Sequence, residues 1–286
     1  MEAWLKSFIM REHLPPDFAA IASDVCKPLA EQIAALAIGP GFTVGICGAQ
    51  GSGKSTLTAV IARRLEGLGL RVAVLSLDDV YLTRDERADL ARRVHPMLAT
   101  RGVPGTHDVG FAETLIADLK GQGAVRMPVF DKAADDRAPP ETWSEIQAPV
   151  DVILFEGWCV GARPQDTADL ALPINDLERT RDPDGVWRNY VNVALAGPYC
   201  PLFEDLGHLI LLAAPSFEVV ADWRGEQETK LRALLAAEGR DPALAMSAQA
   251  VIAFIAHYER LTRHILAEMP DRADQVIWLG PDRRPI

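Results

Sequence analysis

Hydrophobic residues cluster in five short runs along the chain, and the segments between these runs have a mixed, helical pattern. The runs cover residues 42–47, 70–77, 150–157, 208–215 and 275–280. Each run is apolar almost throughout, which is typical of strands that are buried on both faces. Strands that alternate with helices along a chain form parallel sheets with helices on both sides. The pattern therefore predicts an α/β fold with a mostly parallel sheet and helices on both faces.

The spacing of apolar residues between these runs predicts helices. They cover residues 17–38, 54–68, 84–94, 111–121, 185–197, 216–238 and 247–268. We expect the first helix to be interrupted near Pro28, because proline lacks the backbone N–H of a helix interior. Residues 125–130 predict a further short strand, and the composition of 101–110 and 131–145 predicts loops. The sequence has no internal repeat and no clear linker, so we predict a single domain.

The composition is that of an ordinary globular protein, with 49% hydrophobic and 24% charged residues. The net charge of −11 argues against a nucleic-acid partner, because phosphate backbones are bound by many Lys and Arg side chains. Cys26, Cys47, Cys159 and Cys200 lie far apart, which indicates free thiols in a reducing cytosol. The N-terminal apolar stretch is broken by Lys6, and no run reaches the roughly 18 apolar residues of a membrane span. We expect a cytoplasmic protein without a membrane partner.

A glycine-rich stretch joins the first predicted strand to the helix that follows it. Residues 48–55 read Gly-Ala-Gln-Gly-Ser-Gly-Lys-Ser and match the pattern G-x-x-x-x-G-K-[ST]. Glycines let the backbone curl so that successive N–H groups point into one concavity, and the helix N-terminus adds its own unpaired N–H groups. Lys54 is expected to lie along the β- and γ-phosphates of ATP, and the Ser55 hydroxyl is expected to bind Mg²⁺. The predicted ATP-binding residues are Gly48, Ala49, Gln50, Gly51, Ser52, Gly53, Lys54, Ser55 and Thr56.

Acidic residues end two of the other predicted strands. Asp78 and Asp79 follow the strand at 70–77, and Glu156 lies at the end of the strand at 150–157. The carboxyl ends of parallel strands open into one crevice, and we expect the strand at 70–77 to lie directly beside the first strand. An aspartate there can accept a proton from a hydroxyl or orient it for attack, although aspartate also commonly caps a turn. Glu156 is expected to reach the metal, directly or through water.

These motifs carry a resemblance to a known family. The pattern S-x-D-x-x-Y at residues 76–81 and a strand that ends in Glu-Gly resemble phosphoribulokinase, uridine kinase and pantothenate kinase, which are P-loop kinases of small metabolites. In that family the aspartate of S-x-D is the proposed base, and it corresponds to Asp78. Six segments are similar, in the same order, to the D-glycerate 3-kinase branch: LSLDDVYLT, RGVPGTHD, MPVFDKAADDRAP, ILFEGWCVG, LPINDLE and DWRGEQE.

The resemblance covers about residues 42–232. It implies one P-loop kinase domain, with a helical N-terminal extension over residues 1–40 and C-terminal helices with a last strand over 233–286. We expect the bound nucleotide to be ATP with Mg²⁺, and the sequence leaves open whether ATP is preferred over GTP.

Residues that could bind the acceptor fall in two predicted loops and near the second strand. Arg101 and His107 are a reasonable receptor for a carboxylate, because arginine can bind a carboxylate with two hydrogen bonds. Thr106 or Asp108 in the same loop is expected to cap the next helix. The resemblance places acceptor contacts in the following charged loop as well. The candidate acceptor contacts are Asp79, Tyr81, Arg101, His107, Asp131, Lys132 and Arg137.

Arg224 is a candidate catalytic residue on the long predicted helix at 216–238. In the family that it resembles, this region forms a lid whose arginine closes over ATP, where it would neutralise charge on the transferred group together with Lys54. The alternative is a helix face with ion pairs four residues apart, a pattern that Glu228 and Arg232 fit.

The predicted activity is the ATP- and Mg²⁺-dependent phosphorylation of a small hydroxy acid, with D-glycerate and 3-phosphoglycerate as the expected substrate and product. Several cations in the acceptor loops favour an anionic acceptor. The alternatives are a nucleoside, pantothenate or a sugar as acceptor, or a regulatory module that binds ATP and hydrolyses it slowly. Whether Asp78 or Asp79 is the base stays open, and the oligomeric state is not predicted.

Overall fold

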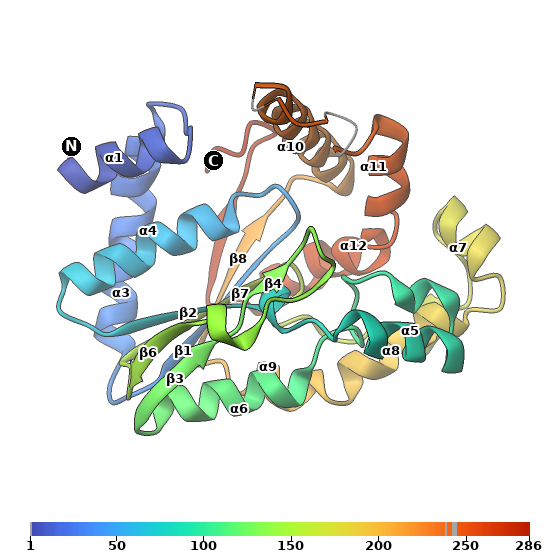
Figure 1. The fold of residues 1–286 in the computed structure, drawn as a ribbon, viewed down its shortest axis with the longest axis horizontal. Coiled ribbons are helices and arrows are strands. Elements are labelled where there is room, and N and C mark those ends of the chain that lie inside the picture. The colour runs from blue at the N-terminus through green and yellow to red at the C-terminus, as the bar shows by residue number, and fades with distance from the viewer. Residues whose placement is uncertain (1, 238, 242–244) are drawn as a thin grey trace.

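A parallel sheet forms the centre of the computed structural model, which describes residues 2–237, 239–241 and 245–286. These residues build a five-stranded sheet in the order β2-β7-β1-β8-β9. Its strands are β1 (Phe42–Gly48), β2 (Val72–Ser76), β7 (Val152–Gly157), β8 (His208–Ala213) and β9 (Gln275–Trp278). Helices cover both faces of this sheet (Figure 1). The predicted α/β fold with a mostly parallel sheet is therefore confirmed.

The order of the strands corrects one expectation. We expected β2 to lie directly beside β1, but β7 lies between them and pairs with both. Every residue of β7 is buried, whereas Val74 of β2 is 42% exposed. The more apolar strand thus takes the inner position and β2 takes the edge. One strand, β7, therefore lies between the strand that leads to Asp78 and the strand that leads to the phosphate loop.

Most helices follow the predicted segments with differences at their ends, but three short helices were not predicted: Ala3–Arg11, Asp176–Arg181 and Tyr199–Glu204. The helices that precede β7 are α1 (Ala3–Arg11), α2 (Phe18–Ile21), α3 (Lys27–Leu36), α4 (Lys54–Gly67), α5 (Arg84–Arg93) and α6 (Val109–Lys120). Those that follow it are α7 (Asp176–Arg181), α8 (Val186–Ala196), α9 (Tyr199–Glu204), α10 (Phe217–Ala237), α11 (Ala248–Ile255) and α12 (Glu259–Glu268). Short 3₁₀ turns lie at η2 (Leu77–Val80), η3 (Pro96–Ala99), η4 (Pro140–Thr142), η5 (Thr167–Leu170) and η7 (Met269–Asp271).

One helix prediction is confirmed and another needs correction. The helix of the N-terminal extension is interrupted near Pro28, because a π-helical turn, η1 (Ala22–Cys26), separates α2 from α3 just before it. Pro28 then lies in the first turn of α3, where a missing N–H costs no helical hydrogen bond. The segment at 247–268 is two helices rather than one, and the buried Tyr258 lies in the turn between α11 and α12.

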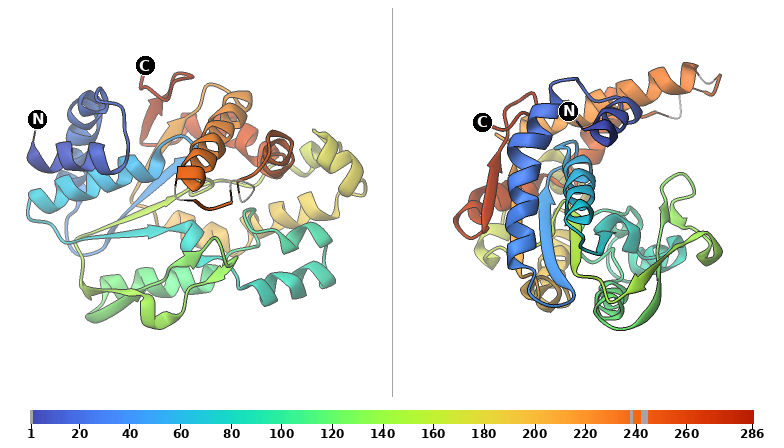
Figure 2. Two further views of the ribbon diagram at one scale, coloured as in Figure 1. Left: turned by 45° about the horizontal axis from the view of Figure 1, so that its top comes forward. Right: turned by 90° about the vertical axis from the view of Figure 1, so that its left-hand side faces the viewer.

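Two antiparallel ribbons replace the expected strand at 125–130 and the expected loop at 131–145. The first pairs β3 (Gly123–Met127) with β6 (Ser144–Ala148), and the second pairs β4 (Phe130–Asp131) with β5 (Asp136–Arg137). We call residues 130–137 the acceptor ribbon, because the sequence predicted acceptor contacts there. In the right-hand view of Figure 2 these green segments project to one side of the central sheet.

Hydrophobic side chains pack on both faces of the sheet. Cys47 and Phe155 face a core built with α6, α8, α9 and α12, whereas Val44 and Leu154 face a core built with α1, α3, α4 and α10. The alternation along each strand explains why every inner strand is apolar throughout. In the part of the chain that the structure describes, no helix is long and apolar enough to cross a bilayer.

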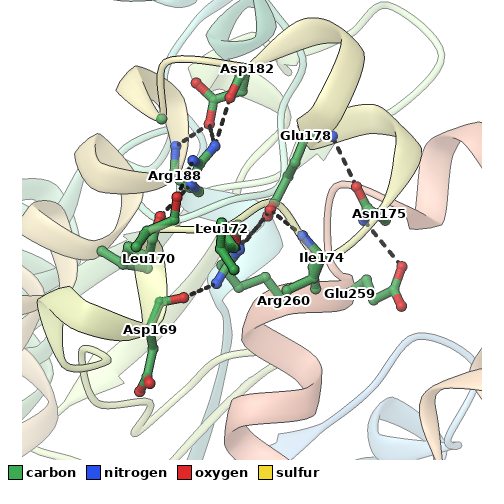
Figure 3. A network of polar contacts seen from close by, with 12 residues as sticks. Asp169, Leu170, Leu172, Ile174, Asn175, Glu178, Asp182, Arg188, Glu259 and Arg260 are labelled. Atoms are coloured by element: carbon green, nitrogen blue, oxygen red, sulfur yellow. Dashed lines mark hydrogen bonds and ion pairs between the residues drawn. The ribbon is translucent and has the colours of Figure 1, made fainter.

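A buried ion-pair network fastens α7 to α12 and the segment before α7 (Figure 3). The guanidinium of Arg260 donates two hydrogen bonds of 2.7 Å to the carboxylate of Glu178. It also donates to the carbonyl oxygens of Asp169 and Leu172, at 2.9 and 2.7 Å. A buried ion pair of this kind is costly to break, because the remaining charge stays buried without its partner.

Replacement of Glu178 by alanine should therefore lower the free energy of unfolding by about 3–5 kcal/mol. Urea denaturation measures this loss. The matched control is Arg179→Ala, since Arg179 forms an exposed ion pair with Asp176 on the same helix. Its effect should stay within about 0.5 kcal/mol. Equal effects of the two substitutions would contradict a stabilising contribution from the buried network.

Candidate active site

The phosphate loop, residues 48–56, curls between the end of β1 and the start of α4. Gly51 and Gly53 adopt φ angles of 78° and 87°, a left-handed conformation that glycine adopts without strain. A Cβ atom on Gly51 would lie 2.8 Å from the Cβ of Trp223, so only glycine fits against α10 at this point. The loop ends at the N-terminus of α4, whose first residue is Lys54. This geometry fits the binding of a phosphate chain by backbone N–H groups.

Glu156 lies at the centre of a hydroxyl cluster where β1, β7 and β2 end. Its Oε1 accepts hydrogen bonds from the hydroxyls of Ser55, at 3.0 Å, and Ser76, at 3.1 Å. Its Oε2 is buried, has no hydrogen-bond partner among the described residues, and lies 3.9 Å from Lys54 Nζ. A carboxylate oxygen without a hydrogen bond beside a serine hydroxyl suits a hard cation such as Mg²⁺.

The residues present fit a bound Mg²⁺ ion. In the described ranges, no group of three or more His, Cys, Asp or Glu side chains could hold a metal by itself. Magnesium is usually bound by one or two protein oxygens together with waters and phosphate oxygens. Ser55 and Glu156 can supply that number of ligands.

Asp78 follows β2 in the turn η2 and is held by two donors. Tyr81 donates its hydroxyl hydrogen to Oδ1 at 2.9 Å, and Lys132 Nζ donates to Oδ2 at 2.6 Å. Burial alone would raise the pKa of Asp78, but the charges of Lys132 and Lys54 and these two hydrogen bonds outweigh it and lower the pKa to about 2. Asp78 is therefore an ionised hydrogen-bond acceptor at neutral pH.

Asp79 differs from its neighbour in its contacts. Its Oδ1 accepts a hydrogen bond from the backbone N–H of Phe130 at 3.1 Å, which fastens the acceptor ribbon to η2. Burial raises the pKa of Asp79. The sequence left open which aspartate faces the chemistry, and these contacts favour Asp78.

A chain of aromatic side chains holds Tyr81 in place. The His107 ring stacks on the Tyr81 ring, with the ring centres 4.4 Å apart. Its Nδ1 lies 2.6 Å from the hydroxyl of Tyr199, which also accepts from the backbone N–H of Gly105. Burial lowers the pKa of His107 to about 3. The histidine is therefore neutral at pH 7 and helps to position Tyr81 and, through it, Asp78.

The expected carboxylate receptor of Arg101 and His107 is not formed in this structure. Arg101 pairs with Asp135 and stacks over the Phe130 ring, and His107 carries no charge. Arg137 donates to the carbonyl of Tyr81 at 2.9 Å and to Asp108 at 2.8 Å.

Asp131 and Asp108 have local structural contacts. The carboxylate of Asp131 accepts from the backbone N–H groups of Ala133 and Ala134 within its own turn. Asp108 accepts from the N–H of Phe111 and so caps α6, as expected of this residue or Thr106. Of the charged side chains predicted to contact the acceptor, Lys132 is the one whose described ion-pair partner is the candidate base.

A solvent-open cleft lies on the other side of the phosphate loop. Gly51 and Gly53 form its floor, and its walls come from residues 12–21, residues 279–285 and α10. Leu212 at the end of β8 also lines it, so the cleft lies on the β8 and β9 side of β1, opposite Glu156 and Asp78. An ion pair between Asp17 and Arg284 joins the two walls that come from opposite ends of the chain.

Comparison with known proteins identifies the family. Residues 43–171 match the phosphoribulokinase / uridine kinase family. An uncharacterized kinase of Schizosaccharomyces pombe is 34% identical over 232 residues, which cover 76% of this chain and 78% of that protein. The chain belongs to the phosphoribulokinase/uridine kinase family.

Further relatives of this kinase fit the D-glycerate 3-kinase-like branch. The chloroplastic D-glycerate 3-kinase of Arabidopsis thaliana is 32% identical over 268 residues, which cover 86% of the present chain but only 54% of that protein. The kinase thus spans about half the length of this relative. The solved structure of a D-glycerate 3-kinase from Cryptococcus neoformans shares the fold, with a TM-score of 0.72 at 24% identity over 90% of this chain and 97% of the other. The predicted resemblance is confirmed.

Arg224 does not contact the cluster of Ser55, Ser76 and Lys54 around Glu156. Its guanidinium pairs with Glu228 on the same helix, donates to Gln227 and lies over the Phe254 ring. These contacts match the ion-paired helix face that was the alternative to a lid arginine. The neighbouring Trp223, rather than Arg224, packs against the phosphate loop.

Two further side chains contact the site, and no prediction from the sequence had named them. Ser76, the first residue of the S-x-D pattern, donates to Glu156, and its place in that pattern could have pointed to it. Arg283 donates to the carbonyl of Gly51 at 2.8 Å and stacks over the Trp223 ring. Nothing in the local sequence distinguishes Arg283 from an ordinary charged tail residue.

The neutral state of His107 gives a pH prediction. Its folded-state pKa of about 3 lies below the usual value of 6.5. Between these values the unfolded chain binds the extra proton, so stability should rise from pH 3 to pH 6.5 and His107 should contribute no slope above it. The contribution is up to about 1.4 kcal/mol per pH unit. An NMR titration in which the His107 ring protons shift between pH 5 and 8 would disprove this assignment.

Proposed function

We propose that this kinase transfers the γ-phosphoryl group of ATP, with Mg²⁺, to the hydroxyl of a small hydroxy acid, and that D-glycerate is converted to 3-phosphoglycerate. The observation that carries the proposal is the pair formed by Asp78 and Lys132 at the carboxyl end of β2. It offers an acceptor for a hydroxyl proton and a cation for an acid group in the same place. Relatives named D-glycerate 3-kinase support this choice of acceptor.

The phosphate loop and Lys54 bind the triphosphate in this proposal. The backbone N–H groups of residues 48–56 surround the phosphates, and Lys54 neutralises charge on the β- and γ-phosphates. Ser55 and Glu156 would hold Mg²⁺, which when bound neutralises charge that develops on the phosphate oxygens. Lys54 also lowers the pKa of Asp78, so the two side chains lie close enough to interact electrostatically.

Asp78 orients the acceptor for attack. The acceptor hydroxyl donates its hydrogen to Oδ2, its oxygen bonds to the γ-phosphorus, and the bond from phosphorus to ADP breaks. A carboxylate with a pKa of about 2 is a weak base, so the proton is taken up as the new bond forms rather than before it. Phosphoryl transfer passes through a loose transition state that needs positioning more than a strong base.

The nucleoside end of ATP is assigned to the cleft on the β8 and β9 side. With phosphates in the loop and Asp78 on the β2 side, the remaining part of ATP extends over Gly51 toward the walls formed by residues 12–21 and 279–285. Arg283 connects the phosphate loop to the wall formed by residues 279–285, because it donates to the carbonyl of Gly51. The N-terminal extension would therefore help to enclose the nucleotide.

A coupled ATP-consumption screen over glycerate, pantothenate, uridine and pentose phosphates tests the acceptor. Asp78→Asn should lower turnover of the accepted substrate by about 10²- to 10⁴-fold, the usual contribution of a positioned base, and leave ATP affinity nearly unchanged. Asp89→Asn is the control, because Asp89 is an exposed aspartate that pairs with Arg92 and Arg93 on α5. Turnover of Asp78→Asn close to that of the control would refute the proposed base. Steady ATP hydrolysis that no acceptor increases would favour the regulatory module instead.

Arg283→Ala tests the placement of ATP. The loss of the contacts to Gly51 and Trp223 should raise the Kd for ATP by about 3- to 10-fold. A hydrogen bond from a charged group contributes about 1.5–3 kcal/mol, and only part of this is lost because Arg283 bonds to the loop and not to ATP. The KM for the acceptor should change little. Quenching of tryptophan fluorescence measures ATP binding, and Arg63→Ala, on the exposed side of α4, is the control. An unchanged Kd would remove Arg283 from the nucleotide site.

A further inference from the structure

The ion pair between Lys132 and Asp78 occupies the oxygen that the proposed reaction needs. Asp78 has two carboxylate oxygens, and each has one donor in this structure. Oδ1 is held by Tyr81, which is buried and fixed by stacking on His107. Oδ2 is held by Lys132, whose side chain is 61% exposed. The fixed donor and the exposed donor can therefore behave differently when an acceptor arrives.

The other charges around the acceptor ribbon are committed to holding it. Arg87 and Arg101 both pair with Asp135, and Arg137 pairs with Asp108 and bonds to the carbonyl of Tyr81. The start of the ribbon is fastened through Asp79 and the N–H of Phe130. These contacts fix the backbone on both sides of Lys132. The lysine side chain can swing on its four-carbon stem without any movement of the ribbon.

An exchange of partners at Lys132 follows from this arrangement and rests on the proposed function. We propose that Lys132 blocks Oδ2 of Asp78 until an acid binds, and that the carboxylate of the acceptor takes Lys132 as its own partner while the acceptor hydroxyl takes the vacated Oδ2. One side chain would then recognise an anionic acceptor and make the base available only when that acceptor is present.

The exchange replaces one ion pair by another. Lys132 leaves one carboxylate for a second, so the number of charge-assisted hydrogen bonds is unchanged. The lysine end of the ion pair is exposed, so water can solvate its ammonium group during the change, which lowers the cost of the exchange. Tyr81 keeps its hydrogen bond to Oδ1 throughout and preserves the orientation of Asp78.

The exchange also limits the hydrolysis of ATP by water. In hydrolysis the oxygen of water bonds to the γ-phosphorus, the bond to ADP breaks, and the proton of water passes to Asp78. While Lys132 donates to Oδ2, its ammonium group takes one of the two acceptor positions of that oxygen and pairs with its negative charge, so a water molecule is bound and deprotonated there less readily. The enzyme without an acid should hydrolyse ATP slowly for this reason.

Lactate separates the two parts of the exchange, because it has the carboxylate and the 2-hydroxyl of glycerate but lacks the 3-hydroxyl. It should inhibit phosphorylation of glycerate competitively. Saturating lactate should raise ATP hydrolysis by the wild-type enzyme about tenfold or more, since a freed base typically contributes at least this much. The readout is phosphate release from ATP without glycerate.

Substitution of Lys132 is the second part of the experiment. Lys132→Met should hydrolyse ATP at the raised rate without any acid, and lactate should add less than about twofold. Its KM for glycerate should rise about 10- to 100-fold, as expected for loss of a hydrogen bond between charged groups. Its preference for glycerate over uncharged glycerol should fall accordingly. Lys120→Met is the matched control, because Lys120, the last residue of α6, forms a surface ion pair of 2.5 Å with Asp205, which follows α9. Its ATP hydrolysis, its response to lactate and its KM for glycerate should match those of the wild type.

The outcomes distinguish this inference from the proposed function. If the wild type phosphorylates glycerate but lactate neither competes nor stimulates hydrolysis, the exchange is wrong and the function stands. The same holds if Lys132→Met keeps the wild-type KM and the slow hydrolysis. If the wild type phosphorylates no hydroxy acid at all, the proposed function fails, and the exchange fails with it.

Discussion

The position of Glu156 between two strands is the constraint on which the site depends. β7 pairs with β1 on one side and β2 on the other, and the register places Glu156 opposite Ile46 and Ser76. One buried carboxylate can then accept from the hydroxyls of Ser55 and Ser76. Because the three strands are parallel and end together, the phosphate loop, the carboxylate and the turn with Asp78 all open toward the same edge.

The contacts around Asp78 are of two kinds: those with buried side chains are rigid, and the one with an exposed side chain can be exchanged. Tyr81, His107 and Tyr199 are buried and hold one another by stacking and hydrogen bonds. Their positions are determined by packing, so the orientation of Asp78 does not depend on bound ligands. Lys132 reaches the same carboxylate from an exposed ribbon, where water competes for its ammonium group. Asp78 thus has a carboxylate that buried side chains hold in a fixed orientation and a cationic partner, Lys132, that can leave it.

Local features could be predicted from the sequence, whereas long-range pairing could not. The phosphate loop and its flanking strand and helix are specified by adjacent residues, because glycine conformation and the helix N-terminus are local properties. The inner position of β7 depends on which strands pair, and the periodicity of a strand says nothing of its neighbours. The types of Arg101 and Arg137 suggested a carboxylate receptor, but their partners Asp135 and Asp108 lie 34 and 29 residues away. Arg283 reaches Gly51 across 232 residues, a contact that no local pattern contains.

The low pKa of Asp78 has a consequence for how specificity arises in this site. While Lys132 pairs with it, a carboxylate with a pKa of about 2 gains little by taking a proton from an alcohol in the ground state, so it cannot activate whichever hydroxyl arrives. In the proposed reaction Asp78 fixes the direction of one hydroxyl toward the γ-phosphate, and a fixed direction helps only an acceptor whose other end is also fixed. A water molecule has no second group that the site could bind. Selection against water therefore requires a cation next to the aspartate, and Lys132 is placed where it can serve an acid group attached to the same molecule as the hydroxyl.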